Sequence, residues 1–140
     1  MDVRRIILDT SAYSAFMGGH AGLKAALQEV DEIALNPVIL GELRAGFLLG
    51  RHRRKHEDEL ARFCASPRVR VVPIDEETSV RYAVIVTALR GAGTPIPTND
   101  VWIAASAMQH GLGVFTTDPH YEKVLQIIVE RFAVARASGE

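Results

Sequence analysis

The chain has 140 residues, 48% of them hydrophobic, which is enough for one compact domain with a buried core. Its 16 basic and 17 acidic residues nearly cancel, so the overall charge does not indicate a general nucleic-acid-binding module. The single cysteine, Cys64, excludes an internal disulfide, and no apolar run approaches the ~20 residues of a membrane helix. No signal-peptide core is evident, so we expect a cytoplasmic protein that does not enter a membrane.

Short apolar strands alternate with helices along the chain. In the first half of the chain, the sequence predicts a strand at 4–9, helices at 10–18 and around 23–30, a strand at 33–35, a helix from Pro37 to Gly50 and a charged helix at 51–65. In the second half, it predicts a strand at 69–74, a helix at 76–89, and a helix that is capped by Thr98 or Asn99 and ends at His110. A strand at 113–117, a short helix at 119–124 and a strand at 125–129 follow. This alternation is typical of a three-layer α/β/α sandwich with a short, mostly parallel central sheet. We expect a single domain at 1–134 and a frayed tail at 135–140.

Four carboxylates lie where a predicted strand ends or on a helix with apolar neighbours. Asp9 closes the first strand, Asp118 follows the strand at 113–117, and Glu42 and Asp100 lie on helices. Acids at the strand ends of an open α/β sheet converge in one crevice. Crowded carboxylates are hard to keep ionised without a cation, and oxygen ligands favour Mg²⁺ or Mn²⁺. The sequence therefore predicts a site for one or two such ions, with chemistry suited to hydrolysis at phosphorus.

Each acid also has a simpler explanation when it is taken alone. Asp9 is a favourable N-cap for the next helix, Asp100 complements a helix dipole, and Asp118 suits a turn. Glu42 is harder to explain in this way, because an ionised glutamate among apolar neighbours costs several kcal/mol unless it is paired or coordinated. Together the four acids favour a metal site.

Four segments around the acids form a recognisable set: LDTSA at Leu8–Ala12, GEL at Gly41–Leu43, IPTNDVWIAASA at Ile96–Ala107 and TTDPHY at Thr116–Tyr121. In this order and spacing they resemble the PIN-domain nucleases, and most closely the VapC toxins of type II toxin–antitoxin modules. The resemblance implies an acidic active site made of Asp9, Glu42, Asp100 and Asp118. It also implies that the Thr116 hydroxyl lies beside the last acid. Ser11 and Asn99 are candidates for orienting carboxylates or water.

The same resemblance implies a metal-dependent endoribonuclease that acts as a toxin on structured RNA, such as tRNA or ribosomal RNA. A small VapB-like antitoxin would bind through a segment that reaches the acidic groove, and homodimers are usual in the family. One alternative is a PIN nuclease that processes or degrades RNA without an antitoxin. Another is a non-catalytic, receiver-like signalling domain, which fits poorly because Thr10 follows Asp9 where a second acid is needed.

The segment from Arg51 to His56 is the one basic cluster of the sequence. Its simplest interpretation is a solvated helix face with Arg54–Asp58 and Lys55–Glu59 ion pairs. Those pairs run in the less favourable order, and a basic first turn opposes the helix dipole, so contact with RNA or an acidic partner is the alternative. The candidates for such contact are Arg51, Arg53, Arg54 and Lys55, together with His120 beyond Asp118. Tyr121, Trp102 and Cys64 are expected to be packing residues.

Overall fold

A computed structural model describes residues 4–134, so the predicted tail at 135–140 lies outside the described residues. The strands are β1 (Arg5–Leu8), β2 (Glu32–Leu35), β3 (Val69–Val71), β4 (Gly113–Thr116) and β5 (Val129–Arg131). They form one sheet in the order β3-β2-β1-β4-β5, and every pairing between them is parallel. The predicted α/β architecture with a parallel sheet is confirmed.

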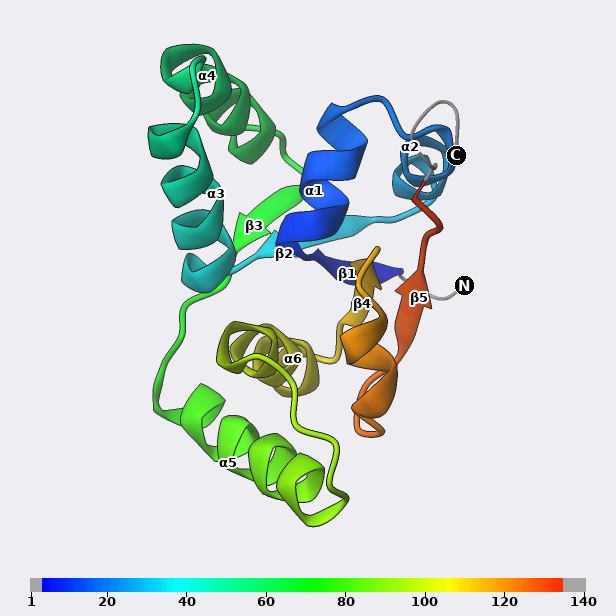
Figure 1. The fold of residues 1–140 in the computed structure, drawn as a ribbon. Coiled ribbons are helices and arrows are strands. Elements are labelled where there is room, and N and C mark those ends of the chain that lie inside the picture. Colours follow the sequence, from blue (N-terminus) through cyan, green and yellow to red (C-terminus); the bar gives the residue numbers. More distant parts are fainter. Residues whose placement is uncertain (1–3, 135–140) are drawn as a thin grey trace, which may run out of the picture.

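Helices cover both faces of this sheet. They are α1 (Thr10–Met17), α2 (Ala21–Gln28), α3 (Pro37–Leu49), α4 (Arg53–Cys64), α5 (Glu76–Gly91), α6 (Thr98–His110) and the short 3-10 helix η1 (Pro119–Lys123). Figure 1 shows α1 and α2 on one side of the sheet and α6 on the other, with α5 packed on the outer side of α6. Helices α3 and α4 run side by side next to α1. Within residues 4–134, no helix is long and apolar enough to cross a membrane.

The central strands consist of apolar residues because both of their faces are covered. Ile7, Leu8, Ala34, Leu35 and Val114 are all 0% exposed. Continuous apolar runs of this kind are typical of buried parallel strands. The core therefore lies around β1, β2 and β4, and it holds rigidly the residues that follow these strands.

Two predicted strands differ from the structure by more than one residue at an end. The strand predicted at 69–74 ends at Val71, because Pro73 has no N–H to continue a ladder. The strand predicted at 125–129 starts only at Val129, and Leu125 is 89% exposed. A strand parallel to β4 must begin level with the start of β4, so the chain after Thr116 must first return along the sheet. Residues 117–128 make that return.

The helix caps differ in one place from the prediction. Asn36 caps α3 as its sequence suggests, accepting a hydrogen bond from the Ile39 N–H at 3.0 Å. Helix α6 instead has Pro97 at its cap position, and neither Thr98 nor Asn99 caps it. Asn99 is inside the first turn, which leaves its side chain free to point toward α3.

The strand order reverses between β1 and β4. The chain passes from β1 outward to β2 and β3 on one side, and from β4 to β5 on the other. In open parallel sheets, the crevice at the carboxyl ends of two such strands is where ligands bind. Asp9 directly follows β1, and Asp118 lies two residues after β4, so both acids are carried to this crevice.

Candidate metal and catalytic site

An open pocket of about 240 Å³ lies at the carboxyl ends of β1 and β4. Its lining residues are Asp9, Thr10, Ser11, Ser14, Glu42, Asp100, Asp118 and Tyr121. The structure thus brings together the four acids that the sequence singled out, from positions spread over most of the chain. No lysine or arginine is among these lining residues.

Asp9 is both a helix cap and a wall of the pocket. It is 3% exposed, and its Oδ1 accepts a hydrogen bond from the Ala12 N–H at 2.8 Å. The Ser11 hydroxyl donates to Oδ1 at 2.8 Å, and the Thr116 hydroxyl donates to Oδ2 at 2.6 Å. Burial raises the pKa of Asp9, although these hydrogen bonds partly oppose the rise. Ser11 and Thr116 therefore both donate to the carboxylate of Asp9. The sequence placed the Thr116 hydroxyl beside Asp118, and this hydroxyl also accepts the Asp118 N–H at 2.9 Å.

Asp100 carries a buried oxygen with no hydrogen-bond partner. It lies in the first turn of α6, and its side chain is 13% exposed. The Tyr121 hydroxyl donates to Oδ1 at 3.2 Å, whereas Oδ2 has no partner within residues 4–134. Burial, and then the charge of Asp118, raise the pKa of Asp100 to about 6. An unpartnered buried carboxylate oxygen is costly, and such atoms in native proteins often mark a bound ion or water.

Tyr121 has a role beside Asp100 that the sequence did not reveal. It is 0% exposed, so its expected packing role is correct, but its hydroxyl also reaches Asp100. Burial raises the pKa of Tyr121 far above its usual range, which keeps the hydroxyl protonated as a donor. The feature of the sequence that could have indicated this role is the position of Tyr121, three residues after Asp118. In the structure this position lies on η1, which contacts α6.

Glu42 reaches the pocket from α3 and is held by two neutral donors. The Thr10 hydroxyl donates to Oε1 at 2.6 Å, and the Asn99 amide donates to Oε2 at 3.2 Å. The apolar face expected around Glu42 is buried on one side only: Ile39, one turn back, is buried, whereas Ala45 and Gly46, one turn on, are exposed. Its carboxylate is satisfied at the edge of an open pocket. The sequence analysis did not identify Thr10 as a partner of Glu42, although its position directly after Asp9 could have indicated this role.

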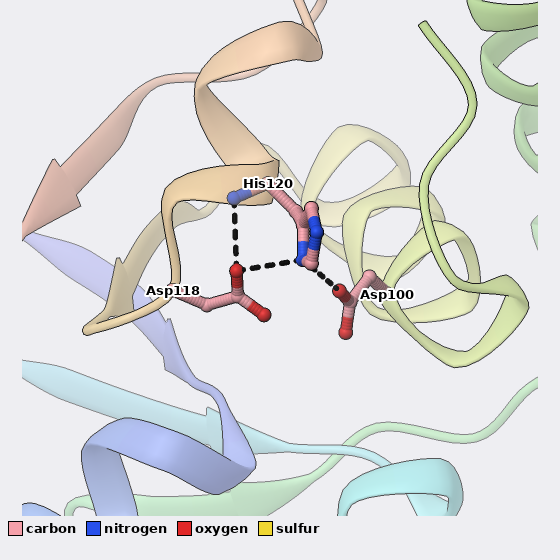
Figure 2. A group of neighbouring side chains, drawn as sticks. All are labelled: Asp100, Asp118 and His120. Atoms are coloured by element: carbon pink, nitrogen blue, oxygen red, sulfur yellow. Dashed lines mark hydrogen bonds and ion pairs between the residues drawn. The ribbon is translucent and has the colours of Figure 1, made fainter.

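Asp118 brings His120 to the same site. Asp118 Oδ1 accepts a hydrogen bond from the His120 backbone N–H at 2.9 Å, so its expected role as a turn residue is also present. The His120 ring nitrogen Nδ1 lies 2.8 Å from Asp118 Oδ1 and 3.6 Å from Asp100 Oδ2 (Figure 2). One ligand atom from each of these three residues lies within 4.8 Å of the other two.

This donor set fits a divalent cation. Carboxylate oxygens dominate it, and the pKa values of Asp9 and Asp100 are both raised in the absence of a positive charge. The unpartnered Asp100 Oδ2 is an acceptor that a cation would satisfy. Asp9, Asp100 and Asp118 are the carboxylates that could hold such an ion, and Glu42 lines the same pocket. The catalytic roles of these residues remain predictions.

A larger groove of about 520 Å³ adjoins the acidic pocket and shares Thr10, Ser14 and Glu42 with it. We call this the α1–α3–α4 groove. Its other lining residues are Tyr13, Met17, Gly18, Leu43, Gly46, Phe47, Lys55, His56 and Glu59. The groove is therefore mainly apolar away from the acids, with one lysine at its side.

The basic cluster lies at the start of α4. Arg51, Arg53, Arg54 and Lys55 are all exposed, and Lys55 also lines the α1–α3–α4 groove. Neither ion pair predicted within this helix forms among residues 4–134, where Glu57 pairs instead with Arg44 at 3.5 Å. The basic side chains are therefore free to meet an anionic partner.

Trp102 and Cys64, which were expected to be packing residues, do not line the acidic pocket. Trp102 stacks on Tyr82 with ring centroids 4.1 Å apart and does not line the acidic pocket. Cys64 is a free, half-buried thiol at the end of α4, packed against the core. Neither takes part in the geometry of the acids.

The family model of the PIN domain matches residues 6–125. This chain belongs to the PIN-domain family. Within that family it is 34% identical over 126 residues to Ribonuclease VapC4 of Mycobacterium tuberculosis, which covers 86% of this chain and 92% of VapC4. The resemblance to the VapC proteins is thereby confirmed, and so is the predicted class of enzyme, a nuclease.

Solved PIN-domain structures share the fold of the whole described chain. VapBC from Salmonella typhimurium, solved bound to DNA, matches with a TM-score of 0.81 at 20% identity, covering 92% of this chain and 98% of the other. VapBC-5 from Mycobacterium tuberculosis, a member of the VapBC family of toxin–antitoxin systems, matches with a TM-score of 0.68 at 28% identity, covering 92% and 98%. The PIN fold, and not only local motifs, is therefore common to them.

Proposed function

We propose that this PIN-domain protein is a Mg²⁺- or Mn²⁺-dependent endoribonuclease and the toxin of a VapBC-like toxin–antitoxin module. The observation that carries the proposal is the pocket in which Asp9, Glu42, Asp100 and Asp118 meet, with Asp100 Oδ2 unpartnered. The name of its relative, Ribonuclease VapC4, supports RNA as the substrate. Transfer RNA and ribosomal RNA are the substrates we expect.

The residues of the pocket suit phosphodiester hydrolysis. When bound, the divalent ion supplies an activated water and neutralises charge on the scissile phosphate. Asp9, Asp100 and Asp118 position that charge, and the hydroxyls of Ser11, Thr116 and Tyr121 hold Asp9 and Asp100 in place. Glu42 keeps free lone pairs on both oxygens, so it accepts a hydrogen bond from water in the pocket. Without a cation, four acids would repel an anionic RNA.

The α1–α3–α4 groove suits a protein segment with apolar side chains and a basic residue. Tyr13, Met17 and Phe47 offer apolar surface, and the acids at the inner end offer partners for a cation. A segment of a cognate antitoxin has this chemistry, and its presence there would close the pocket to RNA. The VapBC-5 complex, at 28% identity, supports an antitoxin partner for this chain.

The exposed basic cluster supports contact with RNA phosphates outside the pocket. Arg51, Arg53, Arg54 and Lys55 lie at the start of α4, beside the groove that leads to the acids. Side chains of this kind neutralise phosphates and make binding depend on salt.

The outer face of α5 supports a homodimer. Val80, Ala83, Val84, Thr87 and Gly91 share this exposed face and carry no charge, and Val80 and Val84 are 51% and 42% exposed. The face ends in opposite charges, Glu76 at the start of α5 and Arg90 in its last turn. Antiparallel pairing of two α5 helices about a two-fold axis places Glu76 of one protomer near Arg90 of the other. The face is thus complementary to a second copy of itself.

We expect the Val84→Glu variant to be monomeric, because the two-fold axis brings two added carboxylates together in a newly buried interface. Size-exclusion chromatography with light scattering measures the mass of the wild type and the variant. The control is Leu125→Glu, which adds the same charge at a residue that is 89% exposed and outside α5. A monomeric wild type, or a dimer that survives Val84→Glu, would rule out this interface.

Induced expression in a bacterial host tests the toxin role. Wild-type protein should arrest growth and create one or a few dominant new RNA 5′ ends, whereas Glu42→Gln should do neither. Co-expression of the cognate antitoxin should restore growth. RNA cleavage without growth arrest would favour a PIN nuclease that processes or degrades RNA without an antitoxin. If no metal-dependent cleavage is found either in cells or in vitro, the proposal is wrong.

A further inference from the structure

We propose that His120 binds the metal ion through Nδ1 and makes the site prefer Mn²⁺ over Mg²⁺. This inference rests on the proposed metal-dependent function, but it concerns a nitrogen ligand that the four acids do not supply. The residues concerned are Asp100, Asp118 and His120 (Figure 2).

Two buried polar atoms that have no hydrogen-bond partner within residues 4–134 face each other at this point. The first is Asp100 Oδ2, and the second is Nδ1 of His120, which lies 3.6 Å away. The His120 side chain as a whole is 41% exposed, so it is the inward-facing nitrogen that is shielded from water. Nδ1 is also 2.8 Å from Asp118 Oδ1, yet it makes no hydrogen bond there. Buried polar atoms are otherwise almost always paired, so a shared cation explains all three positions.

The spacing of these atoms suits ligands of one ion. For metal–ligand bonds of ~2.1 Å, two ligands at right angles lie ~3 Å apart. His120 Nδ1 lies 2.8 Å from Asp118 Oδ1 and 3.6 Å from Asp100 Oδ2, and these two distances lie on either side of that value. One ligand atom from each of the three residues lies within 4.8 Å of the other two, which is compact enough for a common ion.

The backbone holds His120 in this position. The Asp118 carboxylate accepts the backbone N–H of His120 at 2.9 Å, and the Asp118 N–H donates to the Thr116 hydroxyl at 2.9 Å. Pro119 between them restricts the backbone at the start of η1. The chain from Thr116 to His120 is therefore pinned at two points, so the ring is kept on the same side as Asp100.

A nitrogen ligand changes which ion the site prefers. Mg²⁺ favours oxygen ligands and retains water. Imidazole instead suits first-row transition metals, and among these Mn²⁺ also binds carboxylates well. An all-carboxylate pocket would discriminate weakly between Mg²⁺ and Mn²⁺. Adding His120 strengthens the binding of Mn²⁺ more than that of Mg²⁺.

Pulsed electron paramagnetic resonance of the full chain loaded with Mn²⁺ tests the proposal without using activity. The wild type should show modulation from a directly bonded ¹⁴N nucleus, and His120→Ala should bind Mn²⁺ without that modulation. Calorimetric titration should show Mn²⁺ affinity reduced by roughly 10-fold in His120→Ala, in line with the loss of a group that tunes a metal site. Mg²⁺ affinity should change by less than about 2-fold.

The matched control is His110→Ala, at the far end of α6. Residue 110 is ten positions from Asp100, about 15 Å along the helix, and does not line the acidic pocket. This variant should keep both the ¹⁴N signal and the ratio of Mn²⁺ to Mg²⁺ affinity. Thermal melting verifies that each variant is folded.

The outcomes separate this inference from the proposed function. If the wild type binds Mn²⁺ and cleaves RNA but shows no ¹⁴N modulation, His120 is not a ligand and the four-acid site stands. An unchanged ratio of Mn²⁺ to Mg²⁺ affinity in His120→Ala also overturns the inference. If the wild type binds neither ion, the metal-dependent function fails together with it.

Discussion

Replacing Asp100 by asparagine is expected to lower the rate of RNA cleavage by at least ~100-fold, which is the effect of removing one preorganised electrostatic group from a catalytic site. The variant keeps an acceptor for the Tyr121 hydroxyl, so the local packing survives. It loses the negative charge and weakens the one buried carboxylate oxygen of the pocket that has no hydrogen-bond partner within residues 4–134. The cleavage of labelled tRNA in Mn²⁺ buffer, under single-turnover conditions, measures the rate.

The matched control for this experiment is Asp58→Asn. Asp58 is exposed on α4 and lines neither the acidic pocket nor the α1–α3–α4 groove, while the change removes the same charge. Its rate should stay within about 2-fold of the wild type, because isolated surface charges have small effects. Cleavage by Asp100→Asn at a rate similar to that of Asp58→Asn would contradict a catalytic role for Asp100.

The same Asp100→Asn change is expected to stabilise the metal-free protein at pH 7. Burial and the charge of Asp118 raise the pKa of Asp100 from 3.8 to about 6, so the folded state binds a proton more tightly than the unfolded state. The ionised carboxylate therefore destabilises the fold above pH 6. A rise of this size corresponds to a loss of about 3 kcal/mol from the free energy of unfolding, which the neutral amide recovers.

The pH dependence gives the sign of this effect. The stability advantage of Asp100→Asn should be complete above pH 6 and should shrink as the pH falls toward 4, because Asp100 then becomes protonated in the folded wild type. Urea unfolding in the presence of a chelator, at several pH values, measures the free energy of unfolding. Asp58→Asn again serves as the control, and it should show no advantage at either pH.

Adding metal should reverse the order of stability. An ion at ~1,000-fold its Kd stabilises the folded wild type by roughly 4.1 kcal/mol, which exceeds the advantage of the variant, whereas Asp100→Asn should gain much less. A group of acids that destabilises the metal-free fold, and whose destabilising effect is removed when the ion binds, is typical of a functional site rather than a structural one. Equal responses to metal in the two proteins would show that Asp100 does not hold the ion.

The predictions that depended on chain periodicity succeeded in the core. Ile7, Leu8 and Val114 belong to continuous apolar runs, and such runs form buried strands of a parallel sheet because both faces must be covered. The place of Asp9 at the end of β1 followed directly from that run. The position of β5 depends on its pairing with β4. The apolar pattern at 125–129 therefore predicted the wrong residues for this strand, which is Val129–Arg131.

The environments of the acids were predicted less well than their positions. Glu42 was expected among buried neighbours, but Ala45 and Gly46 are exposed, and Thr10 and Asn99 supply its hydrogen bonds. Those donors come from α1 and α6, which are distant from α3 in the sequence. The link between Tyr121 and Asp100 joins η1 to α6 in the same way. A single sequence read by periodicity carries no information about such contacts.

The sequence by itself therefore determined the α/β class, the buried strands and the four acids, because burial and strand ends are local properties of the chain. Only the tertiary structure decided that these acids share one pocket without a basic residue among its lining residues. It also decided that Asp100 Oδ2 has no partner within residues 4–134 and that Nδ1 of His120 faces it. The physical reason is that the strand order β3-β2-β1-β4-β5 places β1 beside β4, and this brings residues more than 100 positions apart, such as Asp9 and Thr116, into contact.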